Sequence, residues 1–159
     1  MFPKIHIIAG AIISILIYLI FPITPLETLT IFLSSFLIDF DHYLLYTFKF
    51  KNISLKNSVR YFFNHRTEWL KILNKERNKY KRNIFFLHSI EAWIVLLILS
   101  LLHPIFYFIL IGFAIHMLLD YTEIIQLREY SFQKISVILT LIDNRKKKTF
   151  QPDFQHQEN

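Results

Sequence analysis

The chain has no cysteine and only two glycines among its 159 residues. The absence of cysteine excludes disulfide bonds, thiolate zinc sites and cysteine nucleophiles, so any metal must be held by imidazole and carboxylate. The scarcity of glycine disfavours a haem protein, because little of the chain could approach a macrocycle closely. Acidic residues are also few, 12 against 18 basic ones, for a net charge of +6.

Apolar side chains, by contrast, are abundant. They make up 53% of the chain, and the mean hydropathy of +0.37 is high for a soluble protein. Four long apolar runs cover residues 5–23, 26–48, 84–102 and 104–120, each close to the length that spans a bilayer. Pro22 and Pro25 separate the first two runs, and Pro104 separates the last two. We therefore predict an all-α fold, an integral membrane four-helix bundle made of two helical hairpins. A soluble bundle with fully buried helices is the alternative.

Lysine and arginine predict the orientation of this bundle. The connector, residues 49–83, carries eleven of them against two glutamates, whereas the two short turns on the other side carry none. By the positive-inside rule, both termini and the connector are cytoplasmic in a multi-pass protein of the cell (inner) membrane. Residues 1–125 then form the membrane domain. Residues 126–159 form a short interfacial segment and a basic tail, since the apolar stretch 135–142 is too short to span.

The ionisable residues within the apolar runs all fall at the predicted cytoplasmic ends of the helices. Such residues are costly in a bilayer and are candidates for function. Pairs spaced by three or four residues share one helix face. Asp39 and Asp41 cannot both face inward from a regular helix, so either the helix ends or unwinds there or Asp41 supports a ligand. The set comprises His6, Asp39, Asp41, His42, His88, Glu91, His116 and Asp120.

Taken singly, each of these residues could be an ordinary interfacial side chain, but together they indicate a metal centre. One or two divalent ions fit the set, with zinc favoured and manganese possible for mixed imidazole and carboxylate ligands. Glu91 or Asp41 is expected to act as the general base or to bridge the metal. His65 is a weaker candidate, and His103 and His156 are not expected to take part. The predicted ligands are His6, Asp39, His42 (as ligand or orienting partner), His88, His116 and Asp120.

The two hairpins also resemble each other. An offset of 82 aligns His6 with His88, and an offset of 81 aligns Asp39 with Asp120. This pattern predicts a tandem repeat with the site at the interface between the repeats.

The same residues carry a family resemblance. His6, the run Asp39-Phe40-Asp41-His42, His88-Ser89 and His116-x-x-x-Asp120 resemble the YdjM-like family of LexA-binding, inner-membrane-associated, metal-dependent hydrolases, over roughly residues 1–125. The family pattern has a proline where this chain has Ile38. It also has an Arg-Gly step close before the His-Ser pair, for which His65-Arg66-Thr67 is the nearest equivalent here. The resemblance implies a metal site more directly than a reaction.

These observations lead to an expected function. A metal held by histidine and aspartate with an open position suits hydrolysis, and the lipid bilayer with its anionic headgroups is the expected partner. A phosphoester such as a lipid headgroup is the expected substrate class. The alternative is a non-catalytic membrane protein that binds metal or recruits cytosolic partners as a scaffold. Basic runs beside a membrane favour anionic lipid over nucleic acid. The connector around Trp69 is either a short amphipathic helix or a solvated loop.

Overall fold

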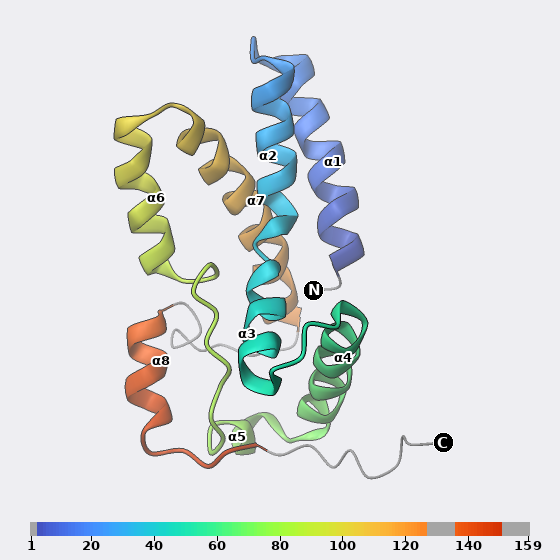
Figure 1. Ribbon diagram of the computed structural model, residues 1–159, viewed down its shortest axis with the longest axis vertical. Helices are drawn as coiled ribbons and strands as arrows, with labels where there is room; N and C mark the ends of the chain where they lie inside the picture. The colour runs from blue at the N-terminus through green and yellow to red at the C-terminus, as the bar shows by residue number, and fades with distance from the viewer. Residues whose placement is uncertain (1–2, 127–135, 151–159) are drawn as a thin grey trace.

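A computed structural model describes residues 3–126 and 136–150 of the chain, and these residues form helices and no strand (Figure 1). The all-α prediction is therefore confirmed over the described ranges. The helices are α1 (Pro3–Ile20), α2 (Pro25–Leu37), α3 (Phe40–Phe50), α4 (Leu55–Lys71), α5 (Asn74–Arg77), α6 (Ile90–Leu102), α7 (Ile105–Gln126) and α8 (Val137–Asn144).

Two antiparallel helix pairs make up the upper part of the molecule in Figure 1: α1 with α2, and α6 with α7. The turn into α2 is closed by a capping box, in which Thr24 and Glu27 bond reciprocally and Pro25 opens the helix. The helices α2 and α7 pack together most extensively, while α1 lies against α2 and α6 against α7. The pairing of helices into two hairpins thus matches the order of the apolar runs.

The close packing around α2 depends on two glycines that face its serines. A Cβ on Gly10 of α1 would lie 3.1 Å from Ser35 Cβ, and the hydroxyl oxygen of Ser35 would be closer still to that Cβ. A Cβ on Gly112 of α7 would lie 2.5 Å from the carbonyl oxygen of Ile31. Small residues at helix interfaces let backbones approach in this way. Both glycines of the chain are therefore used to bring α1 and α7 onto α2.

The second predicted run, residues 26–48, is not one continuous helix. It breaks between α2 and α3, and the two helix axes differ by 42°. Ile38 at the break is almost fully buried and packs in a core with Ala92 and Phe113. In one regular helix, Asp39 and Asp41 could not both face inward. The break removes this restriction, because the two side chains no longer follow one regular helical rotation.

The third predicted run, residues 84–102, also differs from its prediction, because helix α6 begins only at Ile90. The hydroxyl of Ser89 caps α6 by accepting a hydrogen bond from the backbone N–H of Ala92 at 3.3 Å. Residues 84–89 are non-helical, and the N–H of Leu87 instead donates to Asp41 Oδ2 at 2.6 Å. This arrangement places His88 in a loop, where its ring can turn towards the other helices.

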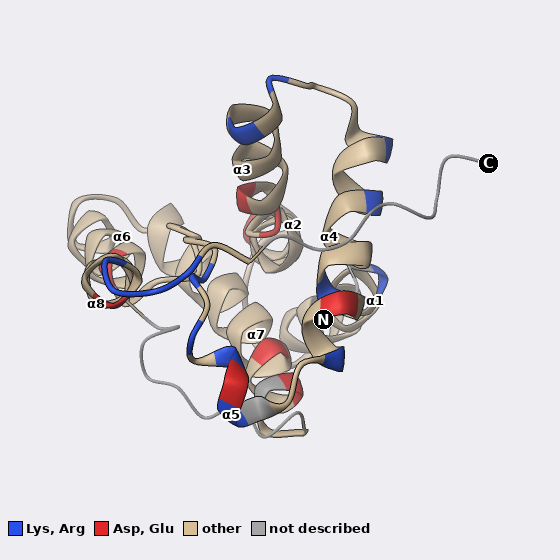
Figure 2. Cartoon of the chain, turned by 90° about the horizontal axis from the view of Figure 1, so that it is seen from below, with Lys and Arg blue, Asp and Glu red and all other residues tan. Residues whose placement is uncertain are grey.

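The connector folds mainly into α4, a longer helix than the short segment expected around Trp69. The buried side chain of Arg77 closes its end by donating to the carbonyl oxygens of Trp69, Leu70 and Ile72. Most of the charged residues coloured in Figure 2 lie on α3, α4, α5 and the segments that follow α5 and α8, and Figure 1 shows these elements in the lower part of the molecule.

By length and composition, one described helix could cross a membrane by itself, over Ile105–Glu123 in α7. The bent pair α2 and α3 meets the same criterion when taken together. The apolar segments Lys4–Ile20 and Ile90–Leu102 are shorter.

Candidate metal centre

The six predicted ligands come together although they come from widely separated parts of the chain. They form three overlapping groups, and within each group one potential ligand atom per residue lies within 4.8 Å of the others. The groups are His6, Asp39 and His116; Asp39, His42 and His88; and His88, His116 and Asp120. Asp39, His88 and His116 each belong to two groups, so the six residues form one cluster, which we call the His/Asp centre.

The buried side of the centre consists of two stacked histidines. The side chains of His6 and His116 are fully buried, and their rings stack with centroids 4.0 Å apart and planes 17° apart. His6 Nε2 lies 3.2 Å from Asp120 Oδ1. The side chains of Asp39 and Asp120 are each 21% exposed, so the carboxylates form the more open side.

The backbone determines which nitrogen of His116 faces the centre. His116 Nδ1 lies 2.8 Å from the carbonyl oxygen of Ser35, and because a carbonyl only accepts, Nδ1 must carry the proton. His116 Nε2 is then free of a proton and faces the cluster, 3.5 Å from Asp120 Oδ2. This is the arrangement of a metal-ligating imidazole, whose other nitrogen donates to an orienting oxygen.

Asp41 performs the same orienting function for His88. Its Oδ2 lies 3.4 Å from His88 Nδ1 and also accepts the N–H of Leu87. His88 Nε2 consequently faces the centre, 3.7 Å from Asp39 Oδ1. Asp41 belongs to none of the three potential ligand groups of the described residues. Its carboxylate positions a candidate ligand, which agrees with the supporting role that the spacing of Asp39 and Asp41 left open.

Two contacts of the centre join residues that the predicted repeat aligns. His6 of the first hairpin meets Asp120 of the second at 3.2 Å, and His88 of the second meets Asp39 of the first at 3.7 Å. The aligned residues therefore pair crosswise between the hairpins. Such an arrangement is expected when two similar hairpins pack about a pseudo-two-fold axis with the site between them.

Glu91, the other predicted base, faces a different part of the molecule. Its carboxylate accepts hydrogen bonds from Ser136 Oγ at 2.5 Å, from the N–H of Val137 at 3.1 Å and from the N–H of Ile138 at 3.2 Å. These donors lie at the start of α8, where a negative charge is favourable. Glu91 thus joins the first turns of α6 and α8, and it belongs to none of the ligand groups of the described residues.

The chemistry of the donors fits a cation. Within the described part of the chain, both ring nitrogens of His6, Asp39 Oδ2 and His42 Nδ1 are buried without a hydrogen-bond partner. Buried polar atoms of this kind are costly unless something else satisfies them. In addition, His88 Nε2 and His116 Nε2 lie 3.2 Å apart, and their Nδ1 atoms both face oxygen acceptors. Two lone pairs facing each other at that distance repel, and either a metal ion between them or a proton on one Nε2 removes the repulsion.

The remaining histidines lie elsewhere. His65, the weaker candidate, packs in α4 against Tyr61, Trp69 and Phe150. Burial and the nearby Lys49 ammonium lower its pKa to about 4. His103 is in the turn between α6 and α7, where its Nδ1 accepts the N–H of Ile105. His156 is outside the described residues.

Sequence reasoning missed one contributor to the centre, the Ser35 carbonyl that orients His116. Every residue has a carbonyl, so no side-chain pattern could have indicated this one. Comparison of the chain with models of protein families, with curated proteins and with solved structures finds no match.

Proposed function

We propose that the chain is a membrane-bound, metal-dependent hydrolase whose His/Asp centre lies at the cytoplasmic face of the cell membrane. The observation that carries this proposal is the convergence of four imidazoles and two carboxylates, with buried ring nitrogens of His6 and His42 that make no hydrogen bond in the described structure. The resemblance to the YdjM-like hydrolases, which rests on the same residues, supports it as well.

The surface of the helices supports the membrane part of the proposal. Large apolar side chains are exposed along α1 and α6, including Leu19 at 72%, Ile20 at 71%, Leu101 at 82% and Leu102 at 76%. Large apolar side chains exposed in such numbers suit contact with lipid. Together α1, the α2–α3 pair, α6 and α7 make the four-span bundle, with the charged end of Figure 2 at the cytoplasmic surface.

Zinc is the ion we propose, since tetrahedral sites of histidine and aspartate are common for it. His6, Asp39, His88, His116 and Asp120 would supply the ligands, of which one catalytic ion needs three beside a water. When bound, such an ion lowers the pKa of a coordinated water towards about 7 and polarises a phosphoryl oxygen.

The protein's own groups supply orientation and proton transfer. Ser35 and Asp41 fix the rings of His116 and His88, as described above. His42, at 32% exposure the most open of the four histidines, lies with its Nδ1 3.6 Å from Asp39 Oδ1. His42 Nε2 would accept a proton from the attacking water. We assign the base to His42 because the carboxylates of Asp41 and Glu91 already accept other hydrogen bonds.

A phosphoester of a membrane lipid is the substrate class we propose. The centre would lie at headgroup depth, and the basic connector would attract anionic phosphate.

Hydrolysis by purified protein tests the proposal. The protein in detergent is stripped with a chelator, reloaded with Zn²⁺ or Mn²⁺, and supplied with phospholipid in mixed micelles. We expect metal-dependent release of a phosphate-bearing product, at least 100-fold slower in Asp120→Asn and unchanged in His103→Ala, the matched control outside the centre. Stoichiometric metal without hydrolysis of any phosphoester would instead favour the non-catalytic metal-binding or scaffold alternative.

A further inference from the structure

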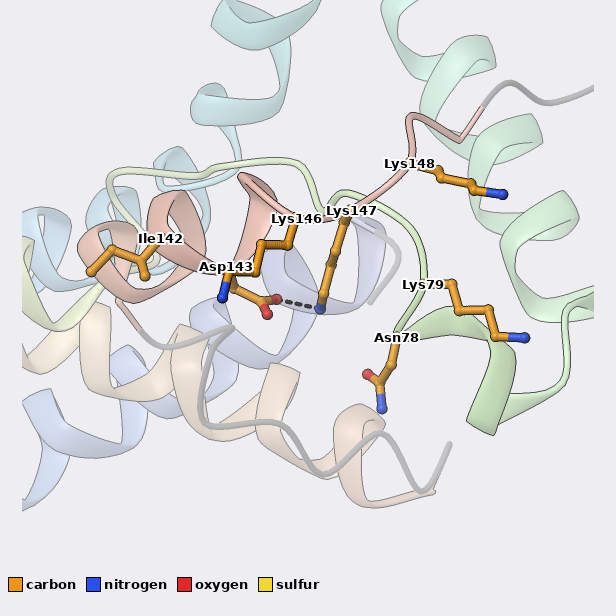
Figure 3. A pocket seen from close by; sticks show the side chains of 7 residues that line it. All are labelled: Asn78, Lys79, Ile142, Asp143, Lys146, Lys147 and Lys148. Carbon is orange, nitrogen blue, oxygen red and sulfur yellow. Dashed lines mark hydrogen bonds and ion pairs between the residues drawn. The ribbon is translucent and has the colours of Figure 1, made fainter.

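A second site lies between the end of α8 and the segment that follows α5 (Figure 3). It is a pocket of about 540 Å³, and it shares no residue with the His/Asp centre. We call it the basic pocket. Its lining residues are Asn78, Lys79, Ile142, Asp143, Lys146, Lys147 and Lys148.

The walls of the basic pocket are held together by backbone pairing. The N–H of Lys81 donates to the carbonyl of Lys148 at 2.7 Å, and the N–H of Lys148 donates to the carbonyl of Lys79 at 3.0 Å. The side chain of Asn144 adds two more bonds, one to the N–H and one to the carbonyl of Arg82, each at 2.9 Å. These bonds fix the lysines of one segment beside those of the other, although more than sixty residues separate them in the chain.

The charge of the basic pocket is strongly positive. Four lysines line it against one carboxylate, Asp143, which pairs with Lys147. Lys79 pairs with Glu76 at 2.5 Å. Lys146 and Lys148 are exposed, and the described residues provide no carboxylate within 4.0 Å of either. Two ammonium groups are therefore available for an anionic ligand.

An apolar surface adjoins these lysines. On α8 the side chains of Ile138, Leu139, Leu141 and Ile142 are each at least 50% exposed. Ile142 is also part of the pocket wall, so the apolar surface and the lysines are continuous. A ligand that covers both must be negatively charged at one end and apolar along the other, as an anionic phospholipid is.

We propose that the basic pocket binds the phosphate headgroup of an anionic phospholipid, with the acyl chains along the apolar side of α8. This proposal does not depend on metal binding or on hydrolysis. Glu91 of α6 holds the first turn of α8, and the basic pocket is at the opposite end of α8, so acyl chains along α8 would run from the pocket towards α6.

The test uses the full chain in a non-ionic detergent. Dioleoylphosphatidylglycerol, dioleoylphosphatidylcholine and inorganic phosphate are titrated separately, and the apparent affinity is taken from the rise in melting temperature. We expect saturable stabilisation by phosphatidylglycerol alone. The double variant Lys146→Gln/Lys148→Gln should bind it about fivefold more weakly for each lysine removed. Lys146→Arg/Lys148→Arg, which keeps the charge, should bind it like the wild type.

The control variant, Lys51→Gln/Lys56→Gln, removes the same charge from exposed lysines near the junction of α3 and α4. We expect it to retain the wild-type affinity. Equal stabilisation by the two lipids would overturn the proposal, and so would equal losses in the test and control variants. Full stabilisation by inorganic phosphate would show that the pocket takes a soluble phosphate and not a lipid.

Discussion

Replacing Gly112 by alanine should push α7 away from α2. The new Cβ would lie 2.5 Å from the backbone carbonyl oxygen of Ile31 and 2.9 Å from Ser34 Cβ. A carbonyl within a helix cannot rotate away, so the helices themselves must separate. Overpacking of this kind costs about 1–3 kcal/mol, and the higher helix propensity of alanine returns about 1 kcal/mol. Taking the upper end for a backbone clash, we expect a loss of about 2 kcal/mol.

Gly10→Ala provides the comparison, because the obstacle there is mainly a hydroxyl. Ser35 Oγ, which donates to the carbonyl of Phe32 at 2.7 Å, can rotate away and lose that bond. The lost hydrogen bond costs about 1 kcal/mol, which the gain in helix propensity offsets. We therefore expect Gly10→Ala to be nearly neutral.

Thermal unfolding in detergent, followed by far-ultraviolet circular dichroism, measures both changes. A loss of about 2 kcal/mol corresponds to a fall of about 4–8 °C in melting temperature for a chain of this size. Adding Ser34→Ala to Gly112→Ala should not restore the stability, since the Ile31 carbonyl stays in place. A neutral Gly112→Ala, or full rescue by Ser34→Ala, would refute the close packing of α2 on α7.

Three further predictions concern single side chains. Asp41→Ala should weaken metal binding about 10–100-fold, because it releases the ring of His88. Asp41→Asn keeps an acceptor for that ring and should weaken metal binding less. Titration with a competing chelator measures both variants. Glu91→Ala should speed amide hydrogen exchange at the start of α8, measured by mass spectrometry, and should leave the metal content unchanged. If exchange is unaltered and hydrolysis by the metal-loaded protein is slower, the capping role of Glu91 is contradicted. Because the pKa of His65 is lowered to about 4, the unfolded chain binds a proton below pH 6.5 that the folded chain does not. Stability should therefore fall from pH 6.5 towards 4, and His65→Gln should reduce the difference in melting temperature between pH 7 and pH 5.

The ionisable side chains made the centre predictable from the sequence. In runs that are otherwise apolar, a histidine or aspartate is conspicuous, and the alternation of helices determines which of them meet. The offset of 81–82 residues between His6 and His88 and between Asp39 and Asp120 predicted a site between the two hairpins, where His6 contacts Asp120 and His88 contacts Asp39. All six predicted ligands lie in the cluster.

What could not be predicted depends on tertiary contacts that have no local signal. An end of the helix near Asp39 and Asp41 was one of two alternatives from the sequence, but nothing in that run indicates that Ile38 packs against Ala92 and Phe113. Glu91 shares a helix face with His88 by spacing, yet its carboxylate turns to the backbone of α8, which no pattern in the third run could indicate. The basic pocket depends on pairing between Lys79 and Lys148, far apart in the chain.

Metal content is the measurement that tests the account most directly. The protein is purified in detergent without added metal, and zinc and manganese are measured per chain in wild type, His116→Ala, Asp39→Ala and the control His103→Ala. We predict stoichiometric transition metal in wild type and in His103→Ala, and a loss of most of it in the other two. A wild type without stoichiometric metal, even after reloading with Zn²⁺ or Mn²⁺, or full retention in His116→Ala and Asp39→Ala, would contradict the account.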